Sequence, residues 1–545
     1  MANAPDSITT LTELLKWRGA VSARDVAFIV DDKAYTYQWL WEGCRTYAAQ
    51  LMRDNVGENE RVLVMVPNSA AFFMAFYGCL LSGAIAVPIF PNAGTDRCQQ
   101  IMQLCGARHI ILPADSPQDK KQTFSEWTRL NDLNLHWVDT SAETNTGADF
   151  PLISEDKIAF IQYTSGSTDF PKGVPLSHQN LLSNIKQMVV AMDITYKDVF
   201  VSWLPVYHDM GLILNTMVPF YTGAVLNLLD EGLHKVHSWL KSIERYKGTF
   251  ISAPDIAYRL CVQSIRQPEA YNLTSLRVAL NASERIRPET YRLFEETFHL
   301  KNVMVSGYGL AEATVAVTMH PPGRPPVIDP DGYVASGRAL QGVDIKIDFE
   351  ALEDAGPGEK KAGEILVNSK SLMKGYFNAQ KNQHPIGEDA YLRTGDIGYL
   401  DPMGNLYVLA RKKNCIKHAG HTLYPDDLEE VVKSVEGIRQ VAAVGIESSH
   451  GMGESLYVFA ESRAHRNHSI DQYHATAVSI VEKIHDHFGI KPARVFLVKP
   501  KTLPRTPNGK MQHSILKSMY LNKLPEFSNN LLYPESRPSG QKGVQ

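Results

Sequence analysis

The strongest constraint on the fold is an alternation of short apolar runs and amphipathic stretches from about residue 60 to residue 310. The apolar runs are predicted strands, and they lie at 61–66, 84–89, 108–112, 158–163, 199–204, 224–229, 249–253, 276–280 and 302–307. Helical patterns follow several of them, for example at 177–190 and 234–246. Buried strands that alternate with helices indicate largely parallel sheets covered by helices on both faces. We therefore expect an α/β protein.

The pattern changes after Gly309 to β segments separated by glycine and proline, of which 363–369 and 405–411 are the clearest. We expect a β-rich subdomain at about 310–411, which completes a large N-terminal body of residues 1–411. Residues 412–524 mix helical and strand patterns and are predicted to form a small, mobile α+β lid. Residues 525–545 are rich in Ser, Asn, Pro and Gly, and we predict a disordered tail.

Composition and charge exclude several classes of function. Lys plus Arg total 55 against 59 Asp plus Glu, so no basic field favours nucleic acid. The six cysteines form no C-x-x-C pair, which argues against a disulfide framework or a structural zinc site. Residues 70–90 carry no charge, but Gly83 and Pro88 divide them, so a buried helix and strand are expected rather than a membrane span. No secretion signal is recognisable, and we expect a cytoplasmic enzyme.

A loop rich in glycine and hydroxyl side chains, Thr164 to Gly173, directly follows the predicted strand at 158–163. Hydroxyl groups can donate to an anion, glycine lets the backbone approach it, and a lysine adds positive charge. The spacing is not that of a P-loop, and no G-x-G-x-x-G follows a strand. We predict that the loop holds the phosphates of a nucleotide through Thr164, Ser165, Gly166, Ser167, Thr168 and Lys172.

Five further strings follow this loop in order, namely WLPVYHDMGLI (203–213), YGLAEAT (308–314), LRTGDIGYL (392–400), ARKKNCIKHAGHTLYPDDLE (410–429) and LPRTPNGKMQ (503–512). The ordered set resembles the adenylate-forming superfamily of acyl-CoA synthetases, luciferases and peptide-synthetase adenylation domains, over nearly the whole chain. YHDMGLI, GLAEAT and YPDDLE are most similar to fatty acyl-AMP ligases. The resemblance implies ATP- and Mg²⁺-dependent activation of a medium- or long-chain fatty acid to acyl-AMP, with release of pyrophosphate, and then acyl transfer to the thiol of an acyl carrier protein.

The resemblance also implies roles around the nucleotide. A carboxylate attacking the α-phosphorus of ATP brings two anions together, so the site must neutralise negative charge. Glu312 corresponds to a magnesium ligand of the family, with the Thr164 hydroxyl nearby. Tyr308 and Gly309 are expected next to the nucleotide. Asp396 corresponds to the residue that accepts both ribose hydroxyls, and Arg411 is its basic partner.

The lid carries two further expected roles. Lys510 resembles the mobile lysine that bridges the substrate carboxylate and the α-phosphate during adenylation. Lys413 corresponds to the hinge about which the lid rotates, because Lys510 must leave before an acceptor thiol can approach along the Gly420 side.

The YHDMGLI string is expected to form the boundary between the adenylate and an acyl pocket. His208 either gates that pocket or only packs, and both interpretations stay open. Asp209 is the less expected residue, since amino-acid-activating relatives have an aspartate at the matching place that pairs with the substrate amine. The predicted acyl pocket comprises Asp209, Gly211, Leu212, Ile213 and Met217, and its mainly apolar side chains suit an alkyl chain.

Two departures from the family pattern leave alternatives open. Asp169 replaces a glycine common in the phosphate loop. The stretch at 319–337 is shorter than in fatty acyl-AMP ligases, so coenzyme A replaces the carrier protein as acceptor in one alternative, an acyl-CoA synthetase. Adenylation of an amino or aryl acid is another alternative, and a non-catalytic adenylate-binding protein is a third.

Overall fold

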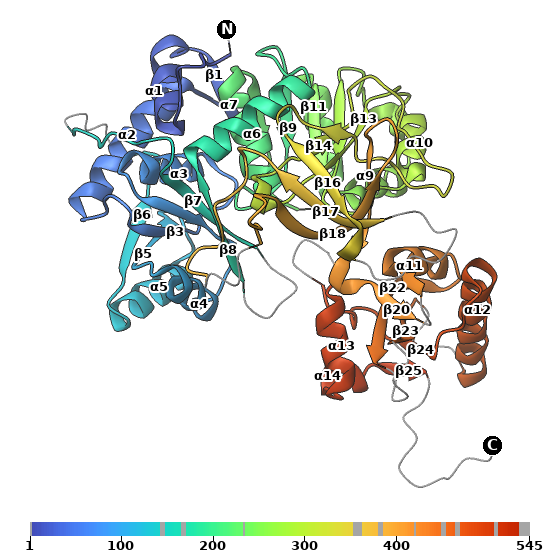
Figure 1. The fold of residues 1–545 in the computed structure, drawn as a ribbon. Coiled ribbons are helices and arrows are strands. Elements are labelled where there is room, and N and C mark those ends of the chain that lie inside the picture. The colour runs from blue at the N-terminus through green and yellow to red at the C-terminus, as the bar shows by residue number, and fades with distance from the viewer. Residues whose placement is uncertain are drawn as a thin grey trace.

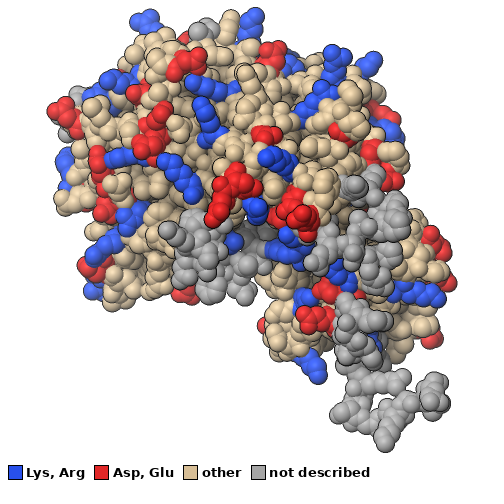
Figure 2. Space-filling model, in the orientation of Figure 1, with Lys and Arg blue, Asp and Glu red and all other residues tan. Residues whose placement is uncertain are grey.

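Two large sheets with helices between them form most of the body, which we define as residues 3–411, and a smaller C-terminal unit (412–533) lies beside it (Figure 1). The computed structural model describes residues 3–141, 148–164, 171–232, 235–351, 362–379, 385–418, 421–447, 454–463, 469–505 and 511–533. Within these residues the strands form five sheets. Over the face shown in Figure 2, basic and acidic side chains are interspersed, in keeping with the net charge of -4.

The first large sheet has nine strands, most of them parallel. Its order is β15 (Arg338–Ala339), β14 (Thr318–Met319), β13 (Met304–Tyr308), β12 (Val278–Asn281), β11 (Phe250–Ala253), β9 (Val199–Ser202), β10 (Val225–Leu228), β1 (Val26–Val30) and β2 (Lys33–Thr36). The second has six strands, in the order β6 (Asn134–Val138), β5 (His109–Pro113), β3 (Arg61–Val64), β4 (Ile85–Pro88), β7 (Ile158–Thr164) and β8 (Lys172–Ser177). All its pairs are parallel except β7 with β8. The predicted α/β class with parallel-rich sheets is therefore confirmed.

Helices cover the sheets because each presents apolar side chains to them. One core joins both sheets to α1 (Leu11–Val21), α2 (Tyr37–Arg53), α3 (Ala70–Leu81), α6 (His178–Ala191), α7 (Val218–Thr222), α8 (Val236–Tyr246), α9 (Asp255–Ser264) and α10 (Pro288–Thr297). A second core packs α4 (Thr95–Cys105) and α5 (Gln118–Leu130) on the other face of the six-stranded sheet.

Residues 70–90 form a buried helix and strand, as their glycine and proline predict. The Ser69 hydroxyl caps α3 by accepting from the Phe72 amide at 3.3 Å, and β4 follows from Ile85. An uncharged helix that is apolar on all sides is stable where protein surrounds it. Among the helices that the structure describes, none is long and apolar enough to cross a membrane.

The β-rich part of the body divides between two sheets. An antiparallel sheet contains β16 (Asp344–Asp348), β17 (Gly363–Asn368), β18 (Leu392–Leu400) and β19 (Leu406–Arg411). The short strands β14 and β15 instead extend the nine-stranded sheet. There β14 pairs with β13, which ends just before the predicted subdomain, and β15 pairs with β14. Which sheet a strand joins depends on the strands with which it pairs, and the local sequence pattern does not predict those partners.

The described residues of the C-terminal unit form a four-stranded sheet, β22-β23-β24-β25, a two-stranded sheet, β20-β21, and two cores. Its elements are β20 (Ile416–His418), β21 (His421–Leu423), α11 (Pro425–Lys433), β22 (Ile438–Glu447), β23 (Glu454–Ser462), α12 (Ile470–Phe488), β24 (Arg494–Val498), α13 (His513–Leu521), α14 (Pro525–Ser528) and β25 (Leu531–Tyr533). Alternate residues of β22 point to opposite faces, so Val441 packs with α11 and α12, and Ala442 packs with α13 and α14.

Order continues past the point where we predicted a disordered tail. Phe527 is buried against Phe459 and Phe496, and β25 pairs with β24. The prediction from Pro525 is therefore wrong through Tyr533, because one buried aromatic ring anchors a segment of otherwise polar composition. Residues 534–545 lie outside the described residues.

A buried arginine connects the N-terminal helix α1 to the end of α7. Arg18 of α1 is 1% exposed and donates to the carbonyl oxygens of Phe220 and Tyr221 at 2.8 and 2.6 Å. These carbonyls belong to the last turn of α7, where the helix itself leaves them without partners. Arg18 thus stabilises the C-terminal end of α7.

We predict that Arg18→Met lowers the melting temperature by roughly 2 to 6 °C, since each unsatisfied buried carbonyl costs about 1–3 kcal/mol. Thermal unfolding followed by circular dichroism measures the effect. Arg24→Met at an exposed position is the matched control and should melt like the wild type. Equal melting of both variants would contradict the stabilising role of Arg18.

Candidate active site

Asp396 lies at the centre of a hydrogen-bonded trio from two sheets. It is 4% exposed on β18, and Arg411 is its cross-strand partner at the end of β19. Arg411 Nε lies 2.8 Å from Asp396 Oδ1, and the Tyr308 hydroxyl donates to Asp396 Oδ2 at 2.6 Å. Burial and the Asp396 carboxylate both raise the pKa of Tyr308, so the phenol keeps its proton as a donor. The trio thus holds a buried carboxylate, a group with several acceptor positions, opposite the end of β19.

A second group connects Glu312 to the end of the phosphate loop. The Tyr376 hydroxyl donates to Glu312 Oε1 at 2.7 Å, and Lys172 Nζ lies 4.7 Å from the centre of the Tyr376 ring. Two backbone bonds fix this arrangement, from Phe377 N to the Gly173 carbonyl and from Met373 N to the Glu312 carbonyl. Burial and the Glu312 carboxylate raise the pKa of Tyr376. Tyr376 therefore lies between an acidic and a basic side chain.

The two groups form one electrostatic site. The Asp396 carboxylate raises the pKa of Arg411, and Tyr308, Glu312 and Tyr376 add to this shift. Burial lowers the pKa of Lys413, and the charges of Arg411 and Lys172 lower it further. Charges that shift one another in this way lie close together. Seven side chains from five separate parts of the sequence thus meet at one place: Lys172, Tyr308, Glu312, Tyr376, Asp396, Arg411 and Lys413.

The predicted phosphate loop connects two antiparallel strands. Thr164 ends β7 and Lys172 begins β8, and the two residues are cross-strand partners. The Thr164 hydroxyl donates to the Lys172 carbonyl at 3.5 Å. The remaining predicted loop residues, Ser165, Gly166, Ser167, Thr168 and Asp169, lie outside the described residues, as do Lys510 and Gly420.

The YHDMGLI string begins a π-helix, Met210–Met217, whose start Asp209 caps. Asp209 Oδ1 accepts from the Met210 amide at 2.7 Å and lies 3.3 Å from His208 Nδ1. Gly211 permits the close approach of this helix to the preceding loop, because a Cβ there would lie 2.0 Å from the Pro205 carbonyl oxygen. The aspartate therefore already has an amide and an imidazole as neighbours.

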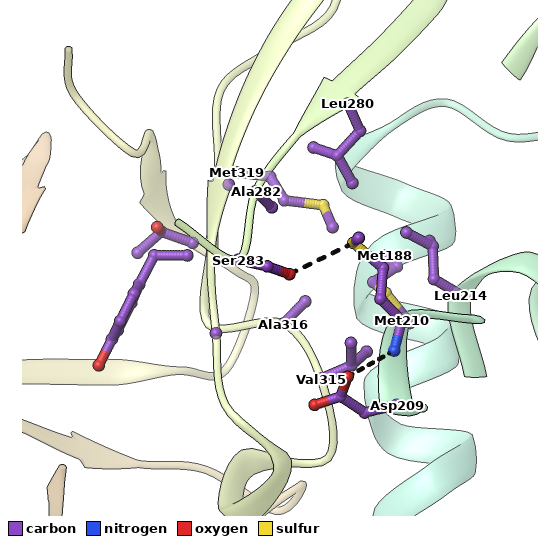
Figure 3. Close-up of a pocket in the computed structure, with 14 residues that line it drawn as sticks. Met188, Asp209, Met210, Leu214, Leu280, Ala282, Ser283, Val315, Ala316 and Met319 are labelled. Atoms are coloured by element: carbon purple, nitrogen blue, oxygen red, sulfur yellow. Dashed lines mark hydrogen bonds between the residues drawn. The ribbon is translucent and has the colours of Figure 1, made fainter. Parts of the chain in front are cut away.

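An apolar cavity of about 40 Å³ lies between the π-helix and the ends of β12 and β13. Figure 3 shows Met188, Met210 and Leu214 on one side of it and Leu280, Ala282 and Met319 on the other. Tyr308, Gly309 and Asp209 also line it, so it adjoins the Asp396 trio. The Ser283 hydroxyl lies 3.8 Å from Met210 Sδ across the cavity.

The lining of this cavity differs from the predicted acyl pocket. The predicted Asp209 lines it, whereas Gly211, Leu212, Ile213 and Met217 do not, and the π-helix instead contributes Met210 and Leu214. The wider turn of a π-helix changes which positions share a face, so the residues that line this cavity differ from those of the predicted pocket, which stays a prediction. The four remaining residues are buried elsewhere in the core.

Sequence reasoning missed two residues of the site. Tyr376 follows Lys374 and Gly375 in an irregular segment, where no strand or helix period draws attention to it. Glu364 of β17 accepts from the Gly395 amide at 3.0 Å and from Lys412 at 2.8 Å, with its side chain 7% exposed. Glu364 thus supports both the part of β18 that carries Asp396 and the segment that carries Lys413. An acidic residue directly before the apolar run Ile365–Val367 of β17 was the one available signal.

Known proteins match this chain over almost its full length. The AMP-binding enzyme family matches residues 15–377, and the C-terminal domain of AMP-binding enzymes matches residues 420–515. The chain is 28% identical to the medium-chain-fatty-acid–[acyl-carrier-protein] ligase JamA of Moorena producens (strain JHB), over 94% of this chain and 95% of that protein. It is 28% identical to the putative fatty-acid–CoA ligase fadD25 of Mycobacterium tuberculosis (strain ATCC 25618 / H37Rv), over 90% and 92%.

A solved structure gives the same result. A chain from a study of fatty acyl-adenylate ligases from E. coli and L. pneumophila superimposes with a TM-score of 0.84 at 26% identity, over 96% of this chain and 99% of that one. The family match covers more than half of the present chain, and the sheets and C-terminal unit match a solved member throughout. The chain therefore belongs to the AMP-binding enzyme family and has the fold of the adenylate-forming superfamily.

Proposed function

We propose that this enzyme activates a fatty acid with ATP to acyl-AMP, releases pyrophosphate, and then transfers the acyl group to the thiol of an acyl carrier protein. The observation that carries the proposal is the position of the Tyr308–Asp396–Arg411 trio beside an apolar cavity. The trio suits a ribose and its phosphate, and the cavity suits an alkyl chain. The name of the relative JamA contains the same two substrates, a fatty acid and an acyl carrier protein.

Individual side chains then have definite roles. Asp396, which Arg411 and Tyr308 hold in place, accepts the ribose hydroxyls. Lys172 and the loop from Thr164 to Thr168 neutralise the phosphates, and Arg411 adds positive charge near the α-phosphate. Lys510 bridges the substrate carboxylate and the α-phosphate. The segment around Lys413 is the hinge between the body and a lid that begins at residue 412.

The donor set suits a Mg²⁺ ion held mainly by the nucleotide. In the part of the chain that the structure describes, no three His, Cys, Asp or Glu side chains gather to hold a metal. Mg²⁺ in nucleotide sites is bound by one or two carboxylates together with substrate phosphates. Glu312, held by Tyr376, fits that single protein ligand, and Thr164 lies at the start of the predicted loop. The ion would neutralise phosphate charge.

The cavity favours a fatty acid over an amino acid. Its walls are mainly Met, Leu and Ala, and Asp209 is engaged by the Met210 amide as a helix cap. At about 40 Å³ the cavity holds a few water molecules. An acyl chain must therefore displace side chains, and the unbranched methionines Met188, Met210 and Met319 can change rotamer at small cost.

Acyl transfer to coenzyme A is the second candidate for the final step. The relative fadD25, named a putative fatty-acid–CoA ligase, matches the chain at the same identity as JamA. Both candidates share the adenylation step and differ only in the thiol that accepts the acyl group.

One experiment tests the whole proposal. The protein is incubated with ATP, Mg²⁺ and saturated acids from butyric to stearic, with and without a phosphopantetheinylated carrier protein or coenzyme A. Mass spectrometry should detect acyl-AMP. When the carrier protein is present, it should also detect that protein with the acyl group attached as a thioester. Absence of an adenylate from every acid would overturn the proposal, and efficient acyl-CoA formation would select the second candidate. An amino-acid panel in parallel checks the role assigned to Asp209.

A further inference from the structure

Two arginines and a tyrosine of the body bind the first helix of the C-terminal unit. Arg285 and Arg287 lie on the loop between β12 and α10, and Tyr333 lies between β14 and β15. Arg285 and Tyr333 both donate to the Asp427 carboxylate of α11, and Arg285 stacks on Tyr333 at 4.7 Å. Arg287 donates to Glu430 one turn further along α11. In Figure 1, α11 lies on the side of the C-terminal unit that faces the body.

Arg287 is held in place by the body itself. Its Nη1 lies 3.5 Å from Oδ2 of Asp255, a carboxylate whose side chain is 1% exposed. The Asn281 side chain donates to the other oxygen, Asp255 Oδ1, at 2.9 Å. The guanidinium therefore has an ion-pair partner in the body as well as in α11, and this partner lowers the side-chain entropy that the contact with Glu430 costs.

Arg285 is largely buried in its contact with the C-terminal unit. Its side chain is 23% exposed and that of Asp427 is 19% exposed. Burial alone would lower the pKa of Arg285, but the charge of Asp427 and its hydrogen bond outweigh burial, and the net pKa shift is upward. A partly buried pair with a second donor, Tyr333, is less screened by salt than an exposed pair. This contact can therefore hold two units of the chain together.

The opposite side of α11 holds the segment that follows Lys510. Glu429 of α11 is 4% exposed, and its Oε1 lies 2.6 Å from His513 Nε2. His513 begins α13, three positions after Lys510 in the sequence. Its Nδ1 lies 3.4 Å from the side-chain nitrogen Nδ2 of Asn414, the residue that follows Lys413. Thus α11 links the body's arginines to both the predicted hinge and the start of α13.

Arg505, which precedes Lys510, is held within the C-terminal unit and has a charged neighbour in the body. Its guanidinium donates to the Gln440 side chain at 2.7 Å. Burial lowers the pKa of Arg505, and the carboxylates of Glu461 and Glu429, with that of Glu284 of the body, oppose this shift. Glu284 lies between Ser283, which lines the apolar cavity, and Arg285, which binds α11. The C-terminal unit thus holds the residues on both sides of Lys510, and Arg505 lies close enough to the body to feel the charge of Glu284.

We propose that Arg285, Arg287 and Tyr333 are positioning residues that hold the C-terminal unit, through Asp427 and Glu430 of α11, in the orientation used for adenylation. The proposal rests on the proposed function, since it assigns this orientation to the first half-reaction. Breaking these contacts releases the C-terminal unit toward other orientations. Acyl-AMP formation then slows, and transfer from preformed acyl-AMP does not.

Two substitutions in α11 test the contact without touching the site. Glu430→Lys places a like charge against Arg287 at a side chain that is 42% exposed, and Asp427→Asn removes the charge that Arg285 faces. Each should reduce kcat for pyrophosphate exchange about tenfold, with KM for ATP and fatty acid nearly unchanged. Transfer from synthetic acyl-AMP should keep its rate or increase. Glu296→Lys is the matched control, because it makes the same charge change beside Arg292 at a side chain of α10 that is 60% exposed.

A measurement that needs no activity separates this proposal from the proposed function. The native cysteines are buried, so fluorophores can be attached to cysteines introduced at Leu152, 98% exposed on the body, and Leu521, 53% exposed on the C-terminal unit. Glu430→Lys and Asp427→Asn should shift or broaden the energy-transfer distribution, and Glu296→Lys should not. Unchanged distributions in both variants, or equal slowing of both half-reactions, would overturn the positioning role. A shift in a protein that adenylates no acid would support the contact and reject the proposed function.

Discussion

Lys510→Ala is expected to slow acyl-AMP formation by at least about 100-fold, the loss typical when one transition-state donor is removed. The lysine is proposed to neutralise charge that develops between the carboxylate and the α-phosphate. Transfer from preformed acyl-AMP no longer involves that charge, so its rate should stay close to that of the wild type. Pyrophosphate exchange measures the first step, and single-turnover transfer to carrier protein measures the second.

The exposed Lys491→Ala variant is the control for the loss of one positive charge from the C-terminal unit, and both of its half-reactions should be normal. Equal losses in the two half-reactions of Lys510→Ala would contradict the assignment, because they would indicate damage to the unit as a whole. The combination with Glu430→Lys is informative as well. If α11 acts by positioning Lys510, the double variant should adenylate no more slowly than Lys510→Ala alone.

Asp396→Asn should reduce kcat/KM for ATP by at least about 100-fold. The carboxylate is buried and neutralises Arg411 while it accepts from Tyr308. An amide of the same shape carries no charge and offers one oxygen, so it cannot hold Arg411, Tyr308 and two ribose hydroxyls together. Hydrogen bonds to charged groups are worth about 1.5–3 kcal/mol each, and the loss of two accounts for the expected effect.

Tyr308→Phe provides the graded comparison for this prediction. It removes one neutral donor and leaves the carboxylate in place, so a loss of only about 3- to 10-fold is expected. Steady-state kinetics across ATP concentrations, together with nucleotide binding by calorimetry, separate binding from chemistry. Near-normal ATP kinetics in Asp396→Asn, with an unchanged melting temperature, would reject the ribose role.

The local sequence was sufficient for the fold class and for most of the candidate side chains. Alternating apolar runs indicated parallel sheets because buried strands and amphipathic helices have different periods. The ordered strings identified Tyr308, Glu312, Asp396, Arg411 and Lys172, which the structure brings together. Their catalytic roles stay predictions until the variants are measured.

Other features required the folded chain, because they depend on contacts between distant residues. Tyr376 joins Lys172 to Glu312 although no motif contains it. The cavity is lined by Met210 and Leu214 of a π-helix, whose turn the sequence period does not reveal. The chain is ordered as far as Tyr533 because Phe527 packs into a core that contains other aromatic rings.

The sequence by itself thus determined the class of fold, the family resemblance and the identity of most polar groups around the nucleotide. Each of these properties depends on residues that are close together in the sequence, through the spacing of hydrophobic residues or through short motifs. Only the tertiary structure decided how Arg285 and Arg287 bind Asp427 and Glu430, which lie more than a hundred positions away. Ion pairs at such separation depend on how whole sheets and helices pack, and no local pattern encodes that geometry.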